Sequence, residues 1–349
     1  MKIFCELKDM KENNGEQLPV GQYLFVGCNE GDPVPILFSE FDGRCAQAKR
    51  TAGVRLTNPG AGNGMSNENI TEKNLGPNLQ SVVSFVAERI SLSDSDFGDG
   101  SELIIESGFS DFLELPWEKI SAKRIFVLRK VVTGERLDPP SSNSLLLVAS
   151  YSNERRTEKL KDLKNKIIIE IIDIVKYALE ALPKQLHISN ISISKHTTIE
   201  KFGALAWDDY NIVHIMMHGD EGGGFCLEAS DINQYNEVDI LEDWEIIHIL
   251  QGKKFLLFFV SSCYSGGGAV NKSSLAFEIV SKGIARYAIG YRYGVGEDSA
   301  GIFAKLFYES LVSGKDFERL EEVYKESLRR YYDNPQADKD YVPILFMNA

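Results

Sequence analysis

Two residues that can do nucleophilic chemistry stand where apolar runs of the sequence end. Cys263 follows the run at residues 255–260, and His218 follows the run at residues 212–217. A thiolate is a strong nucleophile, and a neighbouring imidazole can take the proton from the thiol. We therefore expect Cys263 and His218 to act together as a catalytic pair, which is the chemistry of a cysteine peptidase.

The elements that must position this pair alternate between strand and helix from residue 144 onward. We expect strands at residues 145–149, 187–194, 212–217, 255–260, 286–291 and 341–346. We expect helices at residues 158–182, 197–205, 238–250, 274–281, 298–312 and 317–332. Strands that are apolar on both faces and separated by helices indicate a parallel arrangement. The predicted fold is α/β, with a mostly parallel sheet flanked by helices.

The first hundred residues follow a different pattern. We expect short strands at residues 23–27, 34–38 and 102–106, a helix at residues 79–91 and an Asn- and Gly-rich loop at residues 57–78. The prolines within residues 138–143 mark a linker, because they fix φ and prevent regular pairing. These patterns predict an N-terminal β-rich region at residues 1–101 and a second region at residues 102–349. The α/β core of the second region is expected at residues 144–349.

The predicted sheet gives the pair its geometry. Reactive groups of open α/β sheets gather beyond the carboxyl ends of the strands. If the strands before His218 and Cys263 are neighbours, about 4.8 Å apart, imidazole and sulfur come within reach. Glycines follow both residues, at Gly219 and at residues 266–268, and they let a peptide carbonyl approach closely. We assign the oxyanion hole to the backbone N–H groups of Gly219 and Cys263.

Composition excludes several other classes of protein. A net charge of −13 argues against a nucleic-acid surface, which needs clustered Lys and Arg. No apolar run reaches the length of about 18 residues that a membrane span requires. The five cysteines are scattered without CxxC spacing, so neither a disulfide framework nor a zinc site is expected. We expect a soluble, cytoplasmic protein that needs no metal and no other cofactor.

A second histidine shares the predicted strand with His218. His214 lies four positions earlier, and two histidines on one strand face can form a metal pair. A packed, hydrogen-bonded histidine explains this residue better.

Several motifs, taken in order, resemble the CHAT peptidases, a family of caspase-like domains. They are Asp209 to Gly219, Ser261-Ser262-Cys263-Tyr264-Ser265-Gly266, Leu275 to Gly283 and Ala288-Ile289-Gly290, and the match extends to Asp298 to Ala300, Phe307-Tyr308 and Tyr341 to Phe346. Leu115-Pro116-Trp117-Glu118 is similar to the LPWE signature of the family. The resemblance covers roughly residues 102–349. It implies a caspase-type fold, a His218–Cys263 dyad and hydrolysis of peptide bonds, within a clan that includes metacaspases and separase.

The same resemblance guides a hypothesis about the S1 pocket. Ser261 occupies the position, two before Cys263, where metacaspases carry an acid that binds a basic P1 side chain. Caspase relatives cleave after a charged residue, and Asp220, Glu297 and Asp298 are acids near the motifs. With the acidic balance of the chain, they predict Arg or Lys at P1, bound by Asp298 or Glu297. Capping of the following helix is an equally good interpretation of Asp298.

The serious competing function is a catalytically silent caspase-like scaffold that binds a partner protein. The presence of both dyad residues argues against it, since a scaffold has no reason to keep them. The expected partners are a protein or peptide substrate and a sensor or activator protein, with neither nucleic acid nor membrane. By analogy with bacterial CHAT domains, a role in antiviral defence or programmed death follows from the resemblance.

Overall fold

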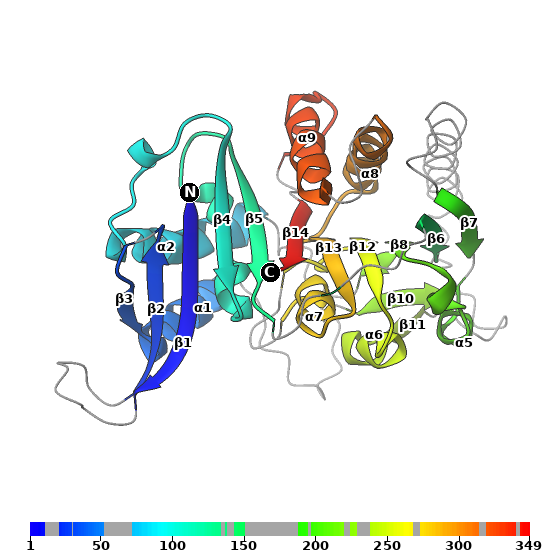
Figure 1. The fold of residues 1–349 in the computed structure, drawn as a ribbon, viewed down its shortest axis with the longest axis horizontal. Helices are drawn as coiled ribbons and strands as arrows, with labels where there is room; N and C mark the ends of the chain where they lie inside the picture. The colour runs from blue at the N-terminus through cyan, green and yellow to red at the C-terminus, as the bar shows by residue number, and fades with distance from the viewer. Residues whose placement is uncertain are drawn as a thin grey trace. The chain divides into compact units, whose positions relative to one another are not determined.

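The structure is a computed structural model, and its chain divides into two compact units (Figure 1). It describes residues 1–10, 21–29, 31–51, 72–133, 137, 143–150, 188–194, 197–219, 224–228, 238–267, 273–313, 319–339 and 343–349. The N-terminal unit comprises Met1–Thr133 with Gly268–Ser273 and Ala349. The C-terminal unit comprises Gly134–Gly267 and Ser274–Asn348. The helix expected at residues 158–182 lies outside the described residues.

The sheet of the C-terminal unit has the strand order β7-β6-β8-β12-β13-β14. The strands are β6 (Asn143–Ala149), β7 (Ile188–Ser194), β8 (Ile212–Met216), β12 (Phe255–Ser261), β13 (Ala285–Tyr291) and β14 (Pro343–Asn348). Neighbours pair in parallel, except for β13 and β14, which are antiparallel. Every residue of β8 and β12 is buried, as their apolar runs require. The prediction of a mostly parallel sheet is confirmed.

Helices cover both faces of this sheet (Figure 1). They are α8 (Glu297–Val312) and α9 (Leu320–Asp333) on one face and α6 (Asp243–Leu250) and α7 (Leu275–Ser281) on the other. Phe259 of β12 packs edge-on against Phe303 and Phe307 of α8, with ring centroids 5.9 and 5.5 Å away. On the opposite face, Phe277 of α7 contacts Phe346 of β14 at 6.1 Å. The strands that lead to the candidate site are therefore held between two layers of helices.

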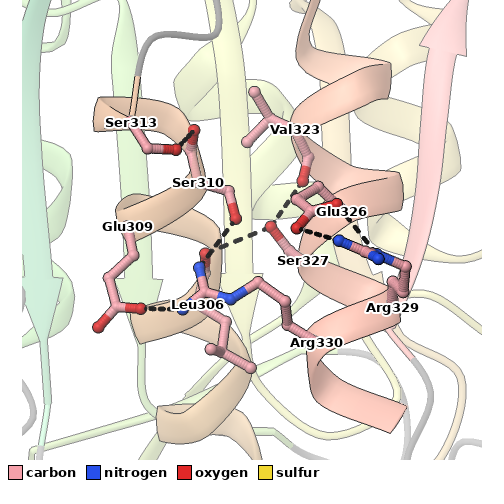
Figure 2. Close-up of polar contacts among 9 residues, drawn as sticks. All are labelled: Leu306, Glu309, Ser310, Ser313, Val323, Glu326, Ser327, Arg329 and Arg330. Atoms are coloured by element: carbon pink, nitrogen blue, oxygen red, sulfur yellow. Dashed lines mark hydrogen bonds and ion pairs between the residues drawn. The ribbon is translucent and has the colours of Figure 1, made fainter. Parts of the chain in front are cut away.

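Polar side chains join α8 to α9 (Figure 2). Arg330 of α9 donates to the Glu309 carboxylate and, at 3.2 Å, to Ser310 Oγ, both on α8. Ser327 Oγ of α9 lies 3.4 Å from the Leu306 carbonyl oxygen of α8. These contacts fix α8, whose N-terminal end adjoins the candidate site.

One predicted helix of this unit is wrong in part. Residues 238–250 form β11 (Val238–Leu241) followed by α6, whereas the apolar pattern predicts a single helix. β11 pairs with β10 (Phe225–Glu228), and β10 pairs with β9 (His218–Gly219), so the three form a small antiparallel sheet. A run of four residues is too short for its periodicity to separate strand from helix.

Helix starts in the C-terminal unit also differ slightly from the sequence prediction. Thr198 caps α5 (Ile199–Gly203) by accepting a hydrogen bond from the Lys201 N–H, so this helix begins two residues later than the expected start at residue 197. Thr197 is buried instead, and its hydroxyl donates to the Ala149 carbonyl oxygen at 3.1 Å. The tertiary contact satisfies that hydroxyl and leaves the cap to the next residue.

The N-terminal unit contains five of the described strands. Its strand order is β3-β2-β1-β4-β5, with β1 (Lys2–Met10), β2 (Gly21–Cys28), β3 (Val34–Leu37), β4 (Ser101–Ser107) and β5 (Ile125–Val131). β1, β2 and β3 pair antiparallel, whereas β1, β4 and β5 pair in parallel. Its longer helices are α1 (Phe38–Thr51) and α2 (Glu72–Arg89). A compact unit is not a functional region, so the division at residues 101 and 102 stays a prediction.

The start of α2 corrects a further prediction. The loop expected at residues 57–78 ends earlier, because α2 already begins at Glu72. Leu79, Val83 and Val86 bury one face of the helix, and such packing outweighs the low helix propensity of the preceding Asn, Gly and Pro residues. Residues 57–71 lie outside the described part of the chain. Among the residues that are described, no helix combines the length and the apolar character that a membrane crossing needs.

Candidate active site

The strands that lead to His218 and Cys263 are neighbours. β8 and β12 pair in parallel, with His214 opposite Phe259 and Met216 opposite Ser261. Beyond these strands, the Met217 N–H donates to the Ser261 carbonyl oxygen at 3.4 Å. Both candidate residues therefore follow at the same edge of the sheet, His218 in β9 and Cys263 in the turn after β12.

Gly219 shows how closely the two chain segments approach. A Cβ atom added to Gly219 would lie 2.2 Å from the Cys263 carbonyl oxygen and 3.0 Å from its nitrogen. It would also lie 2.5 Å from Ser262 Oγ. Only glycine fits this contact, so the His218–Gly219 backbone rests on the Ser262–Cys263 backbone. Both His218 and Cys263 are half-buried, which leaves part of each side chain open to solvent.

The turn that carries Cys263 is fixed against the end of β13. Tyr264 has a φ of 60°, a left-handed conformation that costs a non-glycine residue on the order of 1 kcal/mol or more. Its N–H donates to the Tyr293 carbonyl oxygen at 3.2 Å, and the Gly266 N–H donates to that of Tyr291 at 2.8 Å. A Cβ atom on Gly290 would lie 2.7 Å from the Gly266 nitrogen. Close backbone packing therefore sustains the strained residue beside the thiol.

The sulfur of Cys263 contacts the backbone just before α8. The Val295 N–H donates to Cys263 Sγ at 3.3 Å, and the thiol lies 3.8 Å from the Val295 carbonyl oxygen. The next residue, Gly296, is the N-cap of α8. The thiol therefore lies beside the N-terminal end of this helix.

Beneath the edge of the sheet, His214 is enclosed by hydrogen-bonding groups. Its Nε2 lies 2.9 Å from Ser261 Oγ, and its Nδ1 lies 3.3 Å from the Tyr308 hydroxyl of α8. The ring stacks on Phe259 at 4.2 Å. Burial lowers the pKa of His214 to about 3, so the imidazole is neutral at ordinary pH.

These contacts decide the role of His214. Both ring nitrogens are occupied by neighbouring hydroxyls, as expected for a packed histidine and not for a metal ligand. Within the described ranges, no group of three His, Cys, Asp or Glu side chains could hold a metal ion. Ser261, which stands where metacaspases carry a specificity acid, uses its hydroxyl in this buried pair.

Two of the three S1 candidates lie in the part of the chain that the structure describes, both in the first turn of α8. Asp298 is an exposed residue in the first turn of α8, and Glu297 is the first residue of that helix. Because Gly296 is the N-cap, the interpretation of Asp298 as the helix cap is wrong. Asp220 lies outside the described residues.

Sequence reasoning misses the groups that act through the main chain. The side chain of Val295 has no catalytic chemistry, and Tyr264 fixes the turn through its backbone N–H and its φ, so the type of neither residue marks this role. The run Tyr293-Gly294-Val295-Gly296 between a strand and a helix is the signal that was present, because paired glycines let backbone approach closely.

No protein-family model matches the sequence, and no curated protein matches it. Solved structures give distant matches. A secreted C11 cysteine protease from Bacteroides thetaiotaomicron, in complex with an irreversible peptide inhibitor, matches with a TM-score of 0.35 and 9% identity, over 55% of this chain and 59% of that chain. The complex of Porphyromonas gingivalis RgpB pro- and mature domains matches with a TM-score of 0.47 and 11% identity, over 89% and 76%. The Saccharomyces cerevisiae separase–securin complex matches with a TM-score of 0.41 and 13% identity, over 89% of this chain and 22% of that chain.

Proposed function

We propose that this protein is a cysteine endopeptidase of the CHAT, caspase-like type, with His218 and Cys263 as its dyad. The single observation that supports this most strongly is the contact of the Gly219 backbone with Cys263, where a Cβ atom would lie 2.2 Å from the Cys263 carbonyl oxygen. This contact keeps His218 and Cys263 on adjoining backbones at one edge of the sheet. The half-buried state of both residues leaves room for a substrate.

The proposed reaction begins when His218 takes the thiol proton of Cys263. The thiolate attacks the scissile carbonyl carbon, and the carbonyl oxygen becomes an oxyanion that accepts from the N–H groups of Gly219 and Cys263. The C–N bond then breaks as His218 returns its proton to the leaving amine. Water, deprotonated by His218, hydrolyses the thioester and releases Cys263.

For specificity, we propose Arg or Lys at P1, bound by Asp298 or Glu297, with Asp220 as a further acid. The support is that Val295, three residues before Asp298, touches the nucleophilic sulfur. The first turn of α8 therefore belongs to the surroundings of the thiol. A peptide library tests this: cleavage after Arg or Lys that is lost in Asp298→Asn supports it, and a preference for Asp or an apolar residue at P1 refutes it.

Labelling with an irreversible thiol-directed peptide inhibitor tests the dyad. We expect labelling in the wild type, none in Cys263→Ala, and a rate lowered by about 100-fold or more in His218→Ala. Cys226→Ala is the matched control, because this half-buried cysteine lies on β10 opposite His218 in the strand register. Undiminished labelling of Cys263→Ala would contradict the dyad. No labelling of the wild type, even with candidate partners present, would favour the silent scaffold.

The resemblance to CHAT domains extends the proposal to context. We propose a cytoplasmic enzyme that a sensor or activator protein switches on and that serves in bacterial defence or programmed death. Expression of the wild type and of Cys263→Ala beside neighbouring genes, followed by mass spectrometry of cleaved proteins, tests this. Fragments of a companion protein that require Cys263 support it, whereas identical protein patterns in the two strains contradict it.

A further inference from the structure

We propose that the main-chain N–H of Val295 is a catalytic group of this site, which stabilises the thiolate of Cys263. The proposal rests on the proposed function, in which that thiolate is the nucleophile. It assigns a role in the reaction to a residue whose side chain has no chemistry to offer.

The two contacts between the sulfur and Val295 favour different protonation states of Cys263. A thiolate accepts hydrogen bonds, whereas a neutral thiol can also donate one. The donor at Val295, its nitrogen, lies 3.3 Å from Sγ, and the acceptor, its carbonyl oxygen, lies 3.8 Å away. The nearer contact is the one that a thiolate uses. A hydrogen bond to the charged form of a group stabilises that form.

The position of α8 adds to this effect. The helix is 16 residues long, and Val295 immediately precedes its N-cap. The N-terminal end of such a helix carries a partial positive charge that favours a nearby thiolate. The carboxylate of Asp298 in the first turn offsets part of that field. The N–H of Val295, by contrast, reaches the sulfur directly, at 3.3 Å.

The turn that carries Cys263 also holds the segment that contains Val295 in place. The Tyr264 N–H donates to the Tyr293 carbonyl oxygen at 3.2 Å, which joins the residue after the nucleophile to the segment before α8. A Cβ atom on Gly267 would lie 2.3 Å from the Arg292 carbonyl oxygen, so a second close contact joins the same two segments. A donor fixed before the charge forms needs no rearrangement when it forms.

The main-chain N–H of Val295 neither loses nor gains a proton during the reaction. His218 receives the proton of the thiol, and the Val295 N–H keeps its own while it donates a hydrogen bond to sulfur. When Cys263 becomes a thioester, its sulfur loses the negative charge and that hydrogen bond weakens. When water cleaves the thioester, the departing thiolate regains it. The N–H therefore assists both halves of the reaction.

The test compares Val295→Pro, which lacks the N–H, with Val295→Ala, which keeps it, in the full-length protein. The measurement is the rate at which iodoacetamide alkylates Cys263, followed by mass spectrometry as a function of pH. We expect the alkylation of Cys263 in Val295→Ala to be half-maximal at the same pH as in the wild type, because alanine keeps the N–H. We expect Val295→Pro to reach its half-maximal rate at a pH about one unit higher, a roughly tenfold loss of thiolate at lower pH. Identical pH profiles for the two variants overturn the proposal.

A second variant guards against misfolding of Val295→Pro. Replacing Val295 by its α-hydroxy acid puts an ester oxygen where the N–H was and leaves φ unrestricted, so the same upward shift is expected. An unshifted profile in this variant also overturns the proposal.

Alkylation requires no peptidase activity, so the two hypotheses fail separately. A shifted profile in a protein that cleaves no peptide retains the role of Val295 and rejects the proposed function. An unshifted pH profile in a variant of an active peptidase rejects the role of Val295 and retains the proposed function.

Discussion

At the scale of single residues, the imidazole of His214 is fully buried against Phe259, Ser261 and Tyr308. Burial holds its pKa at about 3, below its ordinary value of 6.5. Between these two values the unfolded chain binds a proton that the folded protein does not. The stability that His214 contributes is therefore complete above pH 6.5 and falls as the pH drops toward 3.

This difference predicts the effect of a substitution. We expect His214→Gln to flatten the pH dependence of the free energy of unfolding between pH 6 and 4, where one such group contributes a slope of up to about 1.4 kcal/mol per pH unit. Urea denaturation at several pH values measures it. Trp244→Gln, at an exposed position on α6, is the control and should keep the wild-type slope, because neither side chain titrates. A wild-type slope in His214→Gln would contradict the assignment.

Gly219 gives a second prediction at this scale. Because a Cβ atom there would meet the Cys263 carbonyl oxygen at 2.2 Å, Gly219→Ala must push the two backbones apart. A displacement of about 1 Å at a catalytic group costs about 100-fold in rate. We expect that loss in the second-order rate of inactivation by the peptide inhibitor.

Gly203→Ala is the matched control for Gly219→Ala, since no atom lies within 4 Å of its added Cβ. It should be inactivated at the wild-type rate. Equal rates for the two variants would mean that the Gly219 contact does not position the dyad.

At the scale of elements, burial on both faces explains which strands the sequence predicts well. β8 and β12 are continuous apolar runs, and such runs are recognisable without knowing their neighbours. The sequence does not separate β11 from α6, because the four residues of the strand continue the apolar pattern of the helix. The contact of Val295 with Cys263 depends on where the end of β13 packs against the turn after β12. No pattern within either segment encodes that contact.

The pairing of α8 with α9 predicts unequal roles for two adjacent arginines. Arg330 donates across to Glu309 and Ser310 of α8, whereas Arg329 pairs with Glu326 on its own helix (Figure 2). We expect Arg330→Ala to lower the free energy of unfolding by about 1 kcal/mol, because partly solvated ion pairs are weak. Arg329→Ala should leave it unchanged. Chemical denaturation measures both, and equal losses would show that the contacts across the helices add nothing.

At the scale of the whole molecule, the two units differ in how far the sequence reveals them. The α/β pattern of the C-terminal unit follows from alternating apolar runs and helices. In the N-terminal unit, β1 went unrecognised although Ile3 and Cys5 are buried between the polar residues Lys2 and Glu6. Phe4 between these two residues is apolar as well, so their burial at every second position does not appear in the sequence as an alternation of apolar and polar residues. Its parallel pairing with β4, about a hundred residues later, is long-range and has no local signal.

The core of the N-terminal unit contains a buried arginine with a partly buried carboxylate beside it. Arg129 on β5 is fully buried, donates to the Leu113 and Leu115 carbonyl oxygens at 2.7 and 3.2 Å, and pairs with Glu118 at 2.7 Å. Glu118 belongs to the LPWE motif, and Trp117 beside it is buried with its Nε1 donating to the Phe112 carbonyl oxygen at 2.8 Å. In this chain the motif therefore stabilises the N-terminal unit.

Removal of that arginine tests whether the units hold their folds separately. Arg129→Met leaves the Glu118 carboxylate and two carbonyl oxygens without this donor, and a buried acceptor that loses its donor costs about 1–3 kcal/mol. Because each unit has its own core, we expect faster hydrogen exchange in β4 and β5 while exchange in β8 and β12 stays at the wild-type rate. Labelling of Cys263 should also be unchanged. If exchange rises equally in all four strands, the two units unfold as one, and the N-terminal unit then supports the active site through the stability of the whole chain.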